Sequence, residues 1–190
     1  MRIDGKTSED IIVNALKVTG NIADLTKLYI TNADNFASLG GETVTISGTV
    51  TAAQADAIAD ATTGAVTANI AAGTAAALNT ALVDAGKQVN AYTLTVTGGA
   101  GTTAAASDLK ALDAKTSVTV NAATVETITG SAADIKTVLA AKTITTAANV
   151  KATVDGVISA ADANTISKAT TGTVTATVTA ATAAALKSAL

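Results

Sequence analysis

The sequence contains no cysteine, no histidine and no tryptophan, and its aromatic residues are limited to two tyrosines and one phenylalanine. Without histidine and cysteine, the chain cannot build a Ser-His-Asp or Cys-His catalytic group, a thiolate metal site or a disulfide framework. With so few aromatic side chains, it also lacks a stacking platform for single-stranded nucleic acid. These absences predict that the protein is not an enzyme.

Charge and hydrophobic runs exclude further classes. The chain has 12 basic and 15 acidic residues, a net charge of −3, and no basic run that would neutralise phosphates, so we expect no nucleic-acid partner. No stretch approaches the roughly 18 uninterrupted apolar residues of a membrane span. The start of the chain, "MRIDGKTSEDIIVNALKVTG", shows no apolar run typical of a signal peptide.

Alanine and threonine dominate the composition, with 46 Ala and 36 Thr among 190 residues. Because aromatic residues make up only 2% of the chain, the core must be built from Ala, Val, Ile and Leu. Such a core is thin and regular, as expected where strands and helices stack closely.

Internal repeats are the strongest signal in the sequence. Residues 46–82 and 154–190 align at an offset of 108 with 20 identities in 37 positions. A shorter motif, Ser/Thr-Ala-Ala, recurs with spacings of 23, 29, 28, 28 and 23 residues, and its first residues are Thr51, Thr74, Thr103, Ser131, Ser159 and Thr182. Six such marks predict about six similar units.

Each mark predicts a helix start, because a Ser or Thr hydroxyl can accept from free backbone N–H groups in the first helical turn. Gln54, Asp134 and Asp162, three residues further on, approximate a capping box. Alternating apolar residues precede the helices and predict strands: Val44 and Ile46; Val66 and Ile70; Tyr92, Leu94 and Val96; Val118 and Val120; Ile144; Val174 and Val178. The predicted unit is strand, turn, helix.

Strands that alternate with helices pair in parallel through right-handed crossovers. The expected fold is therefore an α/β solenoid of strand-turn-helix units with a parallel β-sheet, loosely similar to leucine-rich repeats. Residues 1–42 are expected to form an N-terminal cap, with a helix starting at Thr7, and residues 43–190 the repeat array. Because Leu190 stops inside a repeat helix, the expected partner is a further repeat of a longer chain or another copy of this one.

The segment "AYTLTVTGGAGTTAAASDLKALDAKTSVTVNAATVETITGSAADIKTVLAA" (residues 91–141) and the later "ATTGTVTATVTAATAAAL" carry a family resemblance. They resemble tandem Ala/Thr-rich repeats of very large secreted surface proteins of cyanobacteria and other aquatic bacteria. The resemblance covers roughly residues 43–190 and implies an extracellular or cell-surface scaffold, of the S-layer or adhesin kind. The calcium-binding nonapeptides found in such proteins do not occur here.

A candidate binding surface lies on the outward face of the predicted strands. If Val and Ile point inward, the alternating threonines point outward and stack into a threonine ladder. The six positions that represent it, one on each predicted strand, are Thr45, Thr67, Thr95, Thr119, Thr145 and Thr175. The ladder has three interpretations: threonine simply suits an exposed strand position, or the ladder binds ice or a carbohydrate, or it docks against another chain.

Three weaker candidates have simpler structural explanations. "VDGVISAADAN" partly matches a calcium loop through Asp155 and Asp162, but Lys151 and Thr153 occupy the first ligand positions. We therefore expect no cofactor, with a calcium ion at this loop as the alternative. The glycine-rich "TGGAGTT" (residues 97–103) lacks the lysine of a phosphate-binding loop. Two carboxylate pairs, Asp56 with Asp60 and Asp108 with Asp113, are expected on solvated helix faces.

Overall fold

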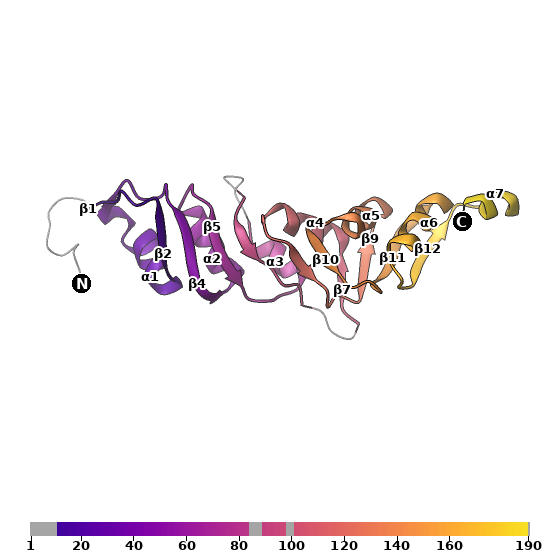
Figure 1. The fold of residues 1–190 in the computed structure, drawn as a ribbon, viewed down its shortest axis with the longest axis horizontal. Coiled ribbons are helices and arrows are strands. Elements are labelled where there is room, and N and C mark those ends of the chain that lie inside the picture. The colour runs from indigo at the N-terminus through magenta and orange to yellow at the C-terminus, as the bar shows by residue number, and fades with distance from the viewer. Residues whose placement is uncertain (1–10, 84–88, 98–100, 190) are drawn as a thin grey trace. The chain divides into compact units, whose positions relative to one another are not determined.

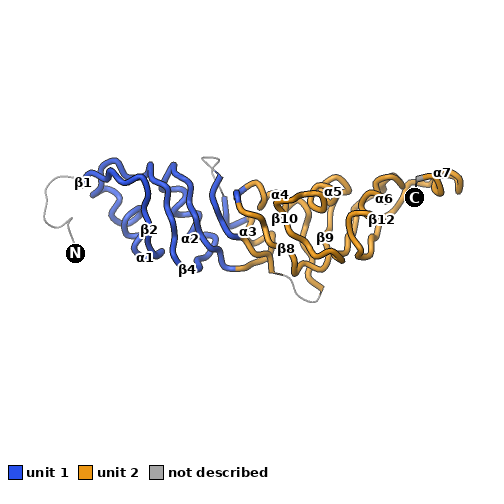
Figure 2. Tube along the Cα trace, viewed as in Figure 1, with its two compact units in different colours: residues 1–71, 80–93, 115–117 blue, residues 72–79, 94–114, 118–190 orange. Residues whose placement is uncertain are grey.

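The computed structural model describes residues 11–83, 89–97 and 101–189. The chain divides into two compact units, coloured separately in Figure 2: unit 1 comprises Met1–Ala71, Thr80–Thr93 and Lys115–Ser117, and unit 2 comprises Ala72–Asn79, Leu94–Ala114 and Val118–Leu190. Each unit contains a four-stranded sheet and a two-stranded sheet.

Unit 1 carries its four-stranded sheet in the order β2-β4-β5-β6, and β1 pairs with β3. Its elements are β1 (Ile11–Ile12), β2 (Lys17–Asn21), α1 (Ile22–Thr26), a π-helical turn (Lys27–Thr31), a 3-10 turn (Ala33–Asn35), β3 (Phe36–Ala37), β4 (Thr43–Val50), α2 (Ala52–Asp60), β5 (Val66–Ile70) and β6 (Ala91–Thr93). Helices α1 and α2 contact each other and the strands of this sheet (Figure 1).

Unit 2 has the sheet order β12-β11-β9-β7, and β8 pairs with β10. Its elements are β7 (Thr103–Ala105), α4 (Ala106–Ala114), β8 (Val120–Ala122), β9 (Thr127–Gly130), α5 (Ala132–Ala140), β10 (Ile144–Thr146), β11 (Lys151–Ile158), α6 (Ala160–Ala169), β12 (Val174–Val178) and α7 (Ala183–Ala189). Helices α4, α5, α6 and α7 contact one another in chain order. The division between the units passes through α3 (Ala75–Ala81).

The predicted parallel α/β class is confirmed. All pairs among the described strands are parallel. The described residues form seven α-helices, and none of their sheets closes into a barrel. Strands and helices alternate along most of the chain. The two strands of each parallel pair are therefore joined by a crossover connection.

Five of the six predicted helix starts are confirmed. Thr51, Ser131 and Ser159 are N-caps whose hydroxyls accept from the backbone N–H three residues later. Thr74 and Thr182 accept in the same way, from Ala77 N and Ala185 N. The full capping box forms only at Thr51, where the Gln54 side chain accepts from the Thr51 backbone N–H.

The helix start at Thr103 is wrong. Thr103 lies in β7 and pairs with Thr127 of β9, and α4 begins three residues later, at Ala106. The Ser/Thr-Ala-Ala motif is compatible with an exposed strand as well as with a cap, because threonine has high strand propensity. Here the pairing with β9 decides between the two.

The helix predicted from Thr7 is also wrong where it can be checked. Residues 7–10 lie outside the described residues, whereas β1 and β2 occupy much of the rest of the predicted helix. Val18 pairs with Val44 of β4, so sheet pairing outweighs the local capping signal. The segment expected as a cap therefore contributes an edge strand to the sheet of unit 1.

The core consists mainly of aliphatic side chains, as predicted, but Tyr29 and Tyr92 are also buried in it. Inward residues of β4 and β5 are buried, and so is at least one large residue on each of the helices α1 to α6, among them Ile58, Leu109, Ile135 and Ile166. Strands β7, β9 and β11 were not among the predicted strands. The inward residues of β11, Ala152, Val154 and Ile158, repeat those of β4 at an offset of 108, which is the signal that could have found this strand.

The two duplicated segments have the same local structure. Strands β4 and β11 each run for eight residues with an identical order of buried and exposed positions. Each contains one glycine with positive φ, Gly48 at 81° and Gly156 at 75°, where the pairing register with the next strand shifts. Only glycine adopts this backbone conformation without strain.

The loop after the helix is repeated in the same detail. Thr62 Oγ1 donates to the Glu42 carbonyl oxygen (2.7 Å) and accepts from Gly64 N (3.0 Å). Thr170 repeats both bonds, donating to the Val150 carbonyl oxygen (2.5 Å) and accepting from the amide two residues later (3.0 Å). Both threonines are buried. In each duplicated segment, the threonine hydroxyl therefore links the loop after the helix to the residue just before the eight-residue strand.

Candidate functional site

The six predicted ladder threonines lie on the outward side of the strands or beside them. Thr67, Thr119, Thr145 and Thr175 are exposed, and Thr45 and Thr95 are half-buried. Their chain neighbours Val44, Val66, Leu94 and Ile144 are buried, so the predicted alternation is observed. The six residues nevertheless lie in several rows.

In unit 1, the row consists of Thr19, Thr45, Thr67 and Ala91, each paired with the next across β2, β4, β5 and β6. A second row contains Thr49, Asn69 and Thr93, and Asn69 Nδ2 donates to Thr49 Oγ1 (3.0 Å). Thr45 and Thr67 are therefore direct neighbours, as predicted. The ladder position on β6 is an alanine.

In unit 2, Thr95 and Thr145 lie on either side of Asn121, which pairs with both. Thr119 does not join this row, because β8 begins only at Val120. Asparagine therefore occupies the position that the sequence assigned to threonine. Its Oδ1 accepts from Ala123 N (3.1 Å), which turns the chain after β8.

A further row of three threonines, in unit 2, was not among the predictions. Thr129, Thr153 and Thr175 are paired in sequence across β9, β11 and β12, with Ala105 of β7 at the end of the row. Thr153 stands 108 residues after Thr45, and Thr175 stands 108 after Thr67. The duplication therefore contained the signal: two threonine pairs in the same register, Thr45 with Thr67 and Thr153 with Thr175.

These rows offer hydroxyl and methyl groups at the spacing of a parallel sheet, about 4.8 Å between strands. Lys17 and Lys151 interrupt the outward face at the start of β2 and β11. Such a surface can hydrogen-bond to a regular lattice or to another polar chain.

Polar pairs between successive helices form a second regular feature, on the helix side of unit 2. Lys110 of α4 is paired with Asp134 of α5, and Lys136 of α5 with Asp162 of α6. In both pairs the lysine is the fifth residue of its helix and the aspartate is the third residue of the next one. Asn79, the fifth residue of α3, donates in the same way to Asp108, the third residue of α4 (3.2 Å).

The hydrogen bonds from these lysines have an electrostatic consequence. The bond from Lys110 lowers the pKa of Asp134 below its ordinary value, and the bond from Ser131 lowers it further. Lys136 and Ser159 lower the pKa of Asp162 for the same reasons. Both carboxylates thus remain ionised in neutral solution, where each accepts from the N-cap hydroxyl of its own helix and binds the lysine of the preceding helix.

The carboxylate pairs expected on solvated helix faces also have structural partners. Asp56 Oδ1 accepts from Val83 N (3.0 Å), and Asp113 Oδ2 accepts from Thr143 Oγ1 (2.9 Å). Asp155, the first acid of the calcium-loop match, is exposed on β11 beside Gly156. Among the described residues, no group of three or more acidic side chains is placed to hold a metal ion.

The glycine-rich segment 97–103 falls partly outside the described residues, since 98–100 are not described. Gly101 N donates to Glu126 Oε2 (3.0 Å). This backbone amide therefore binds a carboxylate of the chain itself, and the carboxylate would repel a phosphate group. The bond joins Gly101 to the loop before β9 in the same unit.

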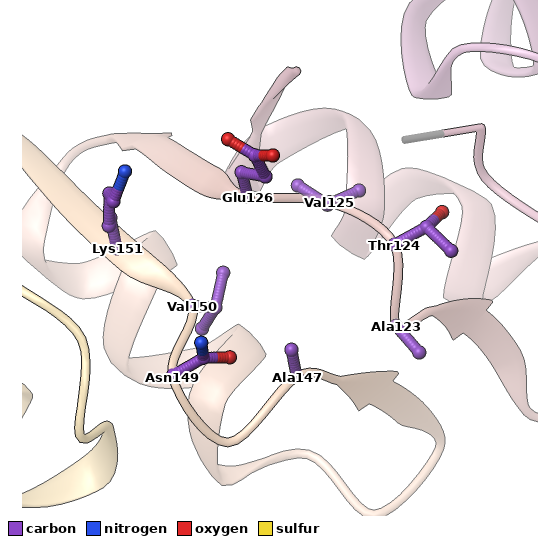
Figure 3. A pocket seen from close by; sticks show the side chains of 8 residues that line it. All are labelled: Ala123, Thr124, Val125, Glu126, Ala147, Asn149, Val150 and Lys151. Carbon is purple, nitrogen blue, oxygen red and sulfur yellow. The ribbon is translucent and has the colours of Figure 1, made fainter. Parts of the chain in front are cut away.

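A pocket of about 340 Å³ lies between two loops of unit 2, lined by Ala123–Glu126 and by Ala147 and Asn149–Lys151 (Figure 3). Its charged side chains are those of Glu126 and Lys151, which are both exposed. The Val125 and Val150 side chains that line it are buried in the core. The polar residues that line it are Thr124, Glu126, Asn149 and Lys151.

Comparisons of the chain with protein-family models, with curated protein sequences and with solved structures gave no significant match. No helix among the described residues is long and apolar enough to span a membrane. Functional interpretation of this chain therefore depends on its own residues and their arrangement.

Proposed function

We propose that the chain is a segment of a non-enzymatic scaffold, in which strand-helix units stack as a solenoid within a cell-surface or self-assembling protein. The observation that carries this proposal is the agreement of the two duplicated segments in their hydrogen bonds. Ala71 N donates to the Val50 carbonyl oxygen (2.7 Å), and Thr179 N, 108 residues later, donates to the Ile158 carbonyl oxygen (2.8 Å). Together with the Thr62 and Thr170 bonds, this gives each copy the same connections to its preceding strand.

The use of polar groups supports a structural role. Asp134 and Asp162 accept from N-cap serines and bind lysines, Asp56 and Asp113 bind neighbouring segments, and Thr170 joins a loop to a strand. These polar groups thus help to hold successive strand-helix units together. In repeat proteins, stability comes from such nearest-neighbour contacts.

The proposed location, extracellular or at the cell surface, and the S-layer-like or adhesin role rest on the resemblance to secreted bacterial repeats. The absence of cysteine is compatible with that location. The proposed partners are further repeats or other copies of the chain.

Solution scattering at the lowest usable concentration tests the solenoid. An elongated single chain is expected, and a compact particle would overturn the proposal. Hydrogen exchange then tests the coupling of units. Ile135→Ala on α5 should lower the protection of backbone amides from exchange in α4, α6 and β9 as well as in α5. Ile135 is fully buried, and α5 contacts all three of these elements.

The matched control is Thr137→Ala on the exposed side of the same helix, where the hydroxyl bonds only to Ala133 of its own helix. This variant should leave protection in the neighbouring helices unchanged. If Ile135→Ala affected only α5, the units would be independent, and the scaffold proposal would lose its physical basis.

A second function is supported by the threonine rows: binding of ice or a carbohydrate through the outward face. The direct register pairs Thr45 with Thr67 and Thr153 with Thr175 favour it. Thr153→Lys should abolish ice-growth inhibition or retention on an insoluble polysaccharide without unfolding the protein. Thr137→Lys, on the helix side, is the control that should retain either activity.

A further inference from the structure

Strands β12 and β2 each lie at one edge of a four-stranded sheet. In the described residues, β12 is the end of its sheet and pairs with β11 alone, and β2 is the end of the other sheet and pairs with β4 alone. A free edge presents unpaired N–H and C=O groups to which another strand can add.

The duplication shows what is uncovered at β12. The inward residues of β5, Val66, Ala68 and Ile70, are 0–3% exposed, and β6 lies on their far side with Ala68 next to Tyr92. The equivalent residues of β12 are only half-buried. Leu186 of α7 is half-exposed, whereas its counterpart Leu78 is buried. The apolar face that β6 covers in the first duplicated segment is therefore partly exposed in the second.

The strand-helix unit that contains β2 shows matching exposure. Leu16, directly before β2, is 90% exposed, and Ile12 of β1 is 66% exposed. Val18, the inward residue of β2, is half-buried, although its partner Val44 is fully buried. Large aliphatic residues at this level of exposure, beside a strand edge, mark an interaction surface.

The register of the existing sheets predicts how the two edges meet. Val18, Val44 and Val66 follow one another across β2, β4 and β5, and Thr19, Thr45 and Thr67 do so in the neighbouring row. At an offset of 108, Val66 corresponds to Val174 and Thr67 to Thr175. A parallel β2 strand in the same register would place Val18 beside Val174 and Thr19 beside Thr175.

The helix pairs independently predict the same partner. Lys187 is the fifth residue of α7, the position that Lys110 and Lys136 occupy on α4 and α5, and it is exposed. Asp24 is the third residue of α1, the position of Asp134 and Asp162, and its backbone N–H donates to the N-cap, Asn21 (3.0 Å). Adding β2 and α1 next to β12 and α7 would therefore complete one more lysine-aspartate pair.

We propose that β12 and α7 of one copy bind β2 and α1 of a second copy of this chain, with Val174 beside Val18, Thr175 beside Thr19 and Lys187 paired with Asp24. The inference rests on the proposed scaffold function and names the surfaces through which the scaffold extends. The two surfaces differ, so a dimer still has one unoccupied β12 edge and one unoccupied β2 edge. Further copies can therefore add beyond the dimer.

Charge reversal tests the pairing, with sedimentation over a concentration series as the measurement. Asp24→Lys and Lys187→Glu should each weaken self-association by roughly threefold to tenfold, because an attraction becomes a repulsion at a partly exposed site. Mixing the two variants should restore it, since each then meets the opposite charge at both interfaces. Lys142→Glu, a reversal at an exposed lysine just after α5, should leave association unchanged.

Ala176→Pro tests the strand edge. Val66 N donates to Asn90 Oδ1, on the side away from β4, so the N–H groups of its counterpart Val174 and of Ala176 point to the free edge. Proline there removes an edge donor and keeps the bonds to β11. The variant should remain folded by circular dichroism and lose association beyond the monomer.

Three outcomes would overturn the inference. An elongated chain that stays monomeric at every concentration would overturn it and leave the scaffold proposal intact. A dimer that saturates and is insensitive to Asp24→Lys would indicate pairing of β12 with β12. Association that persists in Ala176→Pro would place the interface elsewhere. A compact monomer in scattering would instead contradict the scaffold proposal itself.

Discussion

Lys136 on α5 is ion-paired with Asp162 on α6, and the same aspartate accepts from the N-cap residue Ser159 of its own helix. One carboxylate therefore accepts from the N-cap hydroxyl at the start of its own helix and binds a lysine of the preceding helix. Lys110 and Asp134 repeat the arrangement one helix earlier. Because the two pairs are independent copies of one geometry, each serves as the control for the other.

Lys136→Gln should raise the pKa of Asp162 toward its ordinary value of 3.8, because the bond from Lys136 is the largest cause of its lowering. The pKa of Asp134 should not change. Carboxyl titration by NMR measures both. The reciprocal variant, Lys110→Gln, should shift Asp134 and spare Asp162. If the pKa values of both carboxyls changed in either variant, the two lysine-aspartate pairs would be coupled and not independent.

The same pairs predict an acid dependence of stability. A carboxyl whose pKa is lower in the folded state contributes stability above its unfolded pKa, and that contribution is lost as pH falls through the folded pKa. The free energy of unfolding should therefore fall with pH below about 4. Urea titrations should show a smaller fall in the Lys110→Gln/Lys136→Gln double variant. An equal fall would assign acid sensitivity to other groups.

The parallel α/β class and five helix starts could be predicted because they depend on local patterns: a hydroxyl before an apolar stripe, and alternation of β-branched residues. The strand at Thr103 and the edge strand at Lys17–Asn21 could not, because pairing with distant segments decides them. The threonine rows were partly predictable. Alternation identifies outward residues, but register determines that Asn121, and not Thr119, stands between Thr95 and Thr145.

Glycines in the duplicated loops lie against the strand before them. A Cβ on Gly64 would lie 2.1 Å from the Glu42 carbonyl oxygen, and one on Gly172 would lie 2.3 Å from the Asn149 carbonyl oxygen. Alanine at either position must displace backbone, which costs about 1–3 kcal/mol or more. Gly41→Ala, where nothing lies within 4 Å, is the control. Urea unfolding should separate the three variants, and equal stabilities would refute the close approach.

The hydroxyl of Thr62 predicts a second loss of stability. Thr62→Val keeps the shape of the side chain but leaves the Glu42 carbonyl oxygen and Gly64 N without this buried partner, which costs about 1–3 kcal/mol. Thr62→Ser should restore most of it. The neighbour Thr63 is exposed and donates to the Gly40 carbonyl oxygen (3.1 Å), so Thr63→Val should cost less. Chemical denaturation ranks them; a larger loss for Thr63→Val would argue against the buried bond.

Tyr29 and Glu42 predict an alkaline dependence in unit 1. Tyr29 is 4% exposed and its hydroxyl donates to Glu42 Oε2 (3.1 Å). Burial raises the pKa of Tyr29, and the charge of Glu42 raises it further. The folded state then keeps a proton that the unfolded state loses, so this contribution is present below about pH 10 and is lost as pH rises beyond it.

Tyr29→Phe should remove this alkaline decrease, although it also removes the hydroxyl that Glu42 accepts from and therefore lowers stability at neutral pH. Urea unfolding at a series of pH values from 8 upward measures both effects. Glu42→Gln tests the cause, because removing the charge should lower the pKa of Tyr29 and make the decrease smaller. If wild type and Tyr29→Phe lost stability in parallel as pH rose, deprotonation of other groups would account for the decrease, and the Tyr29–Glu42 bond would not contribute to it.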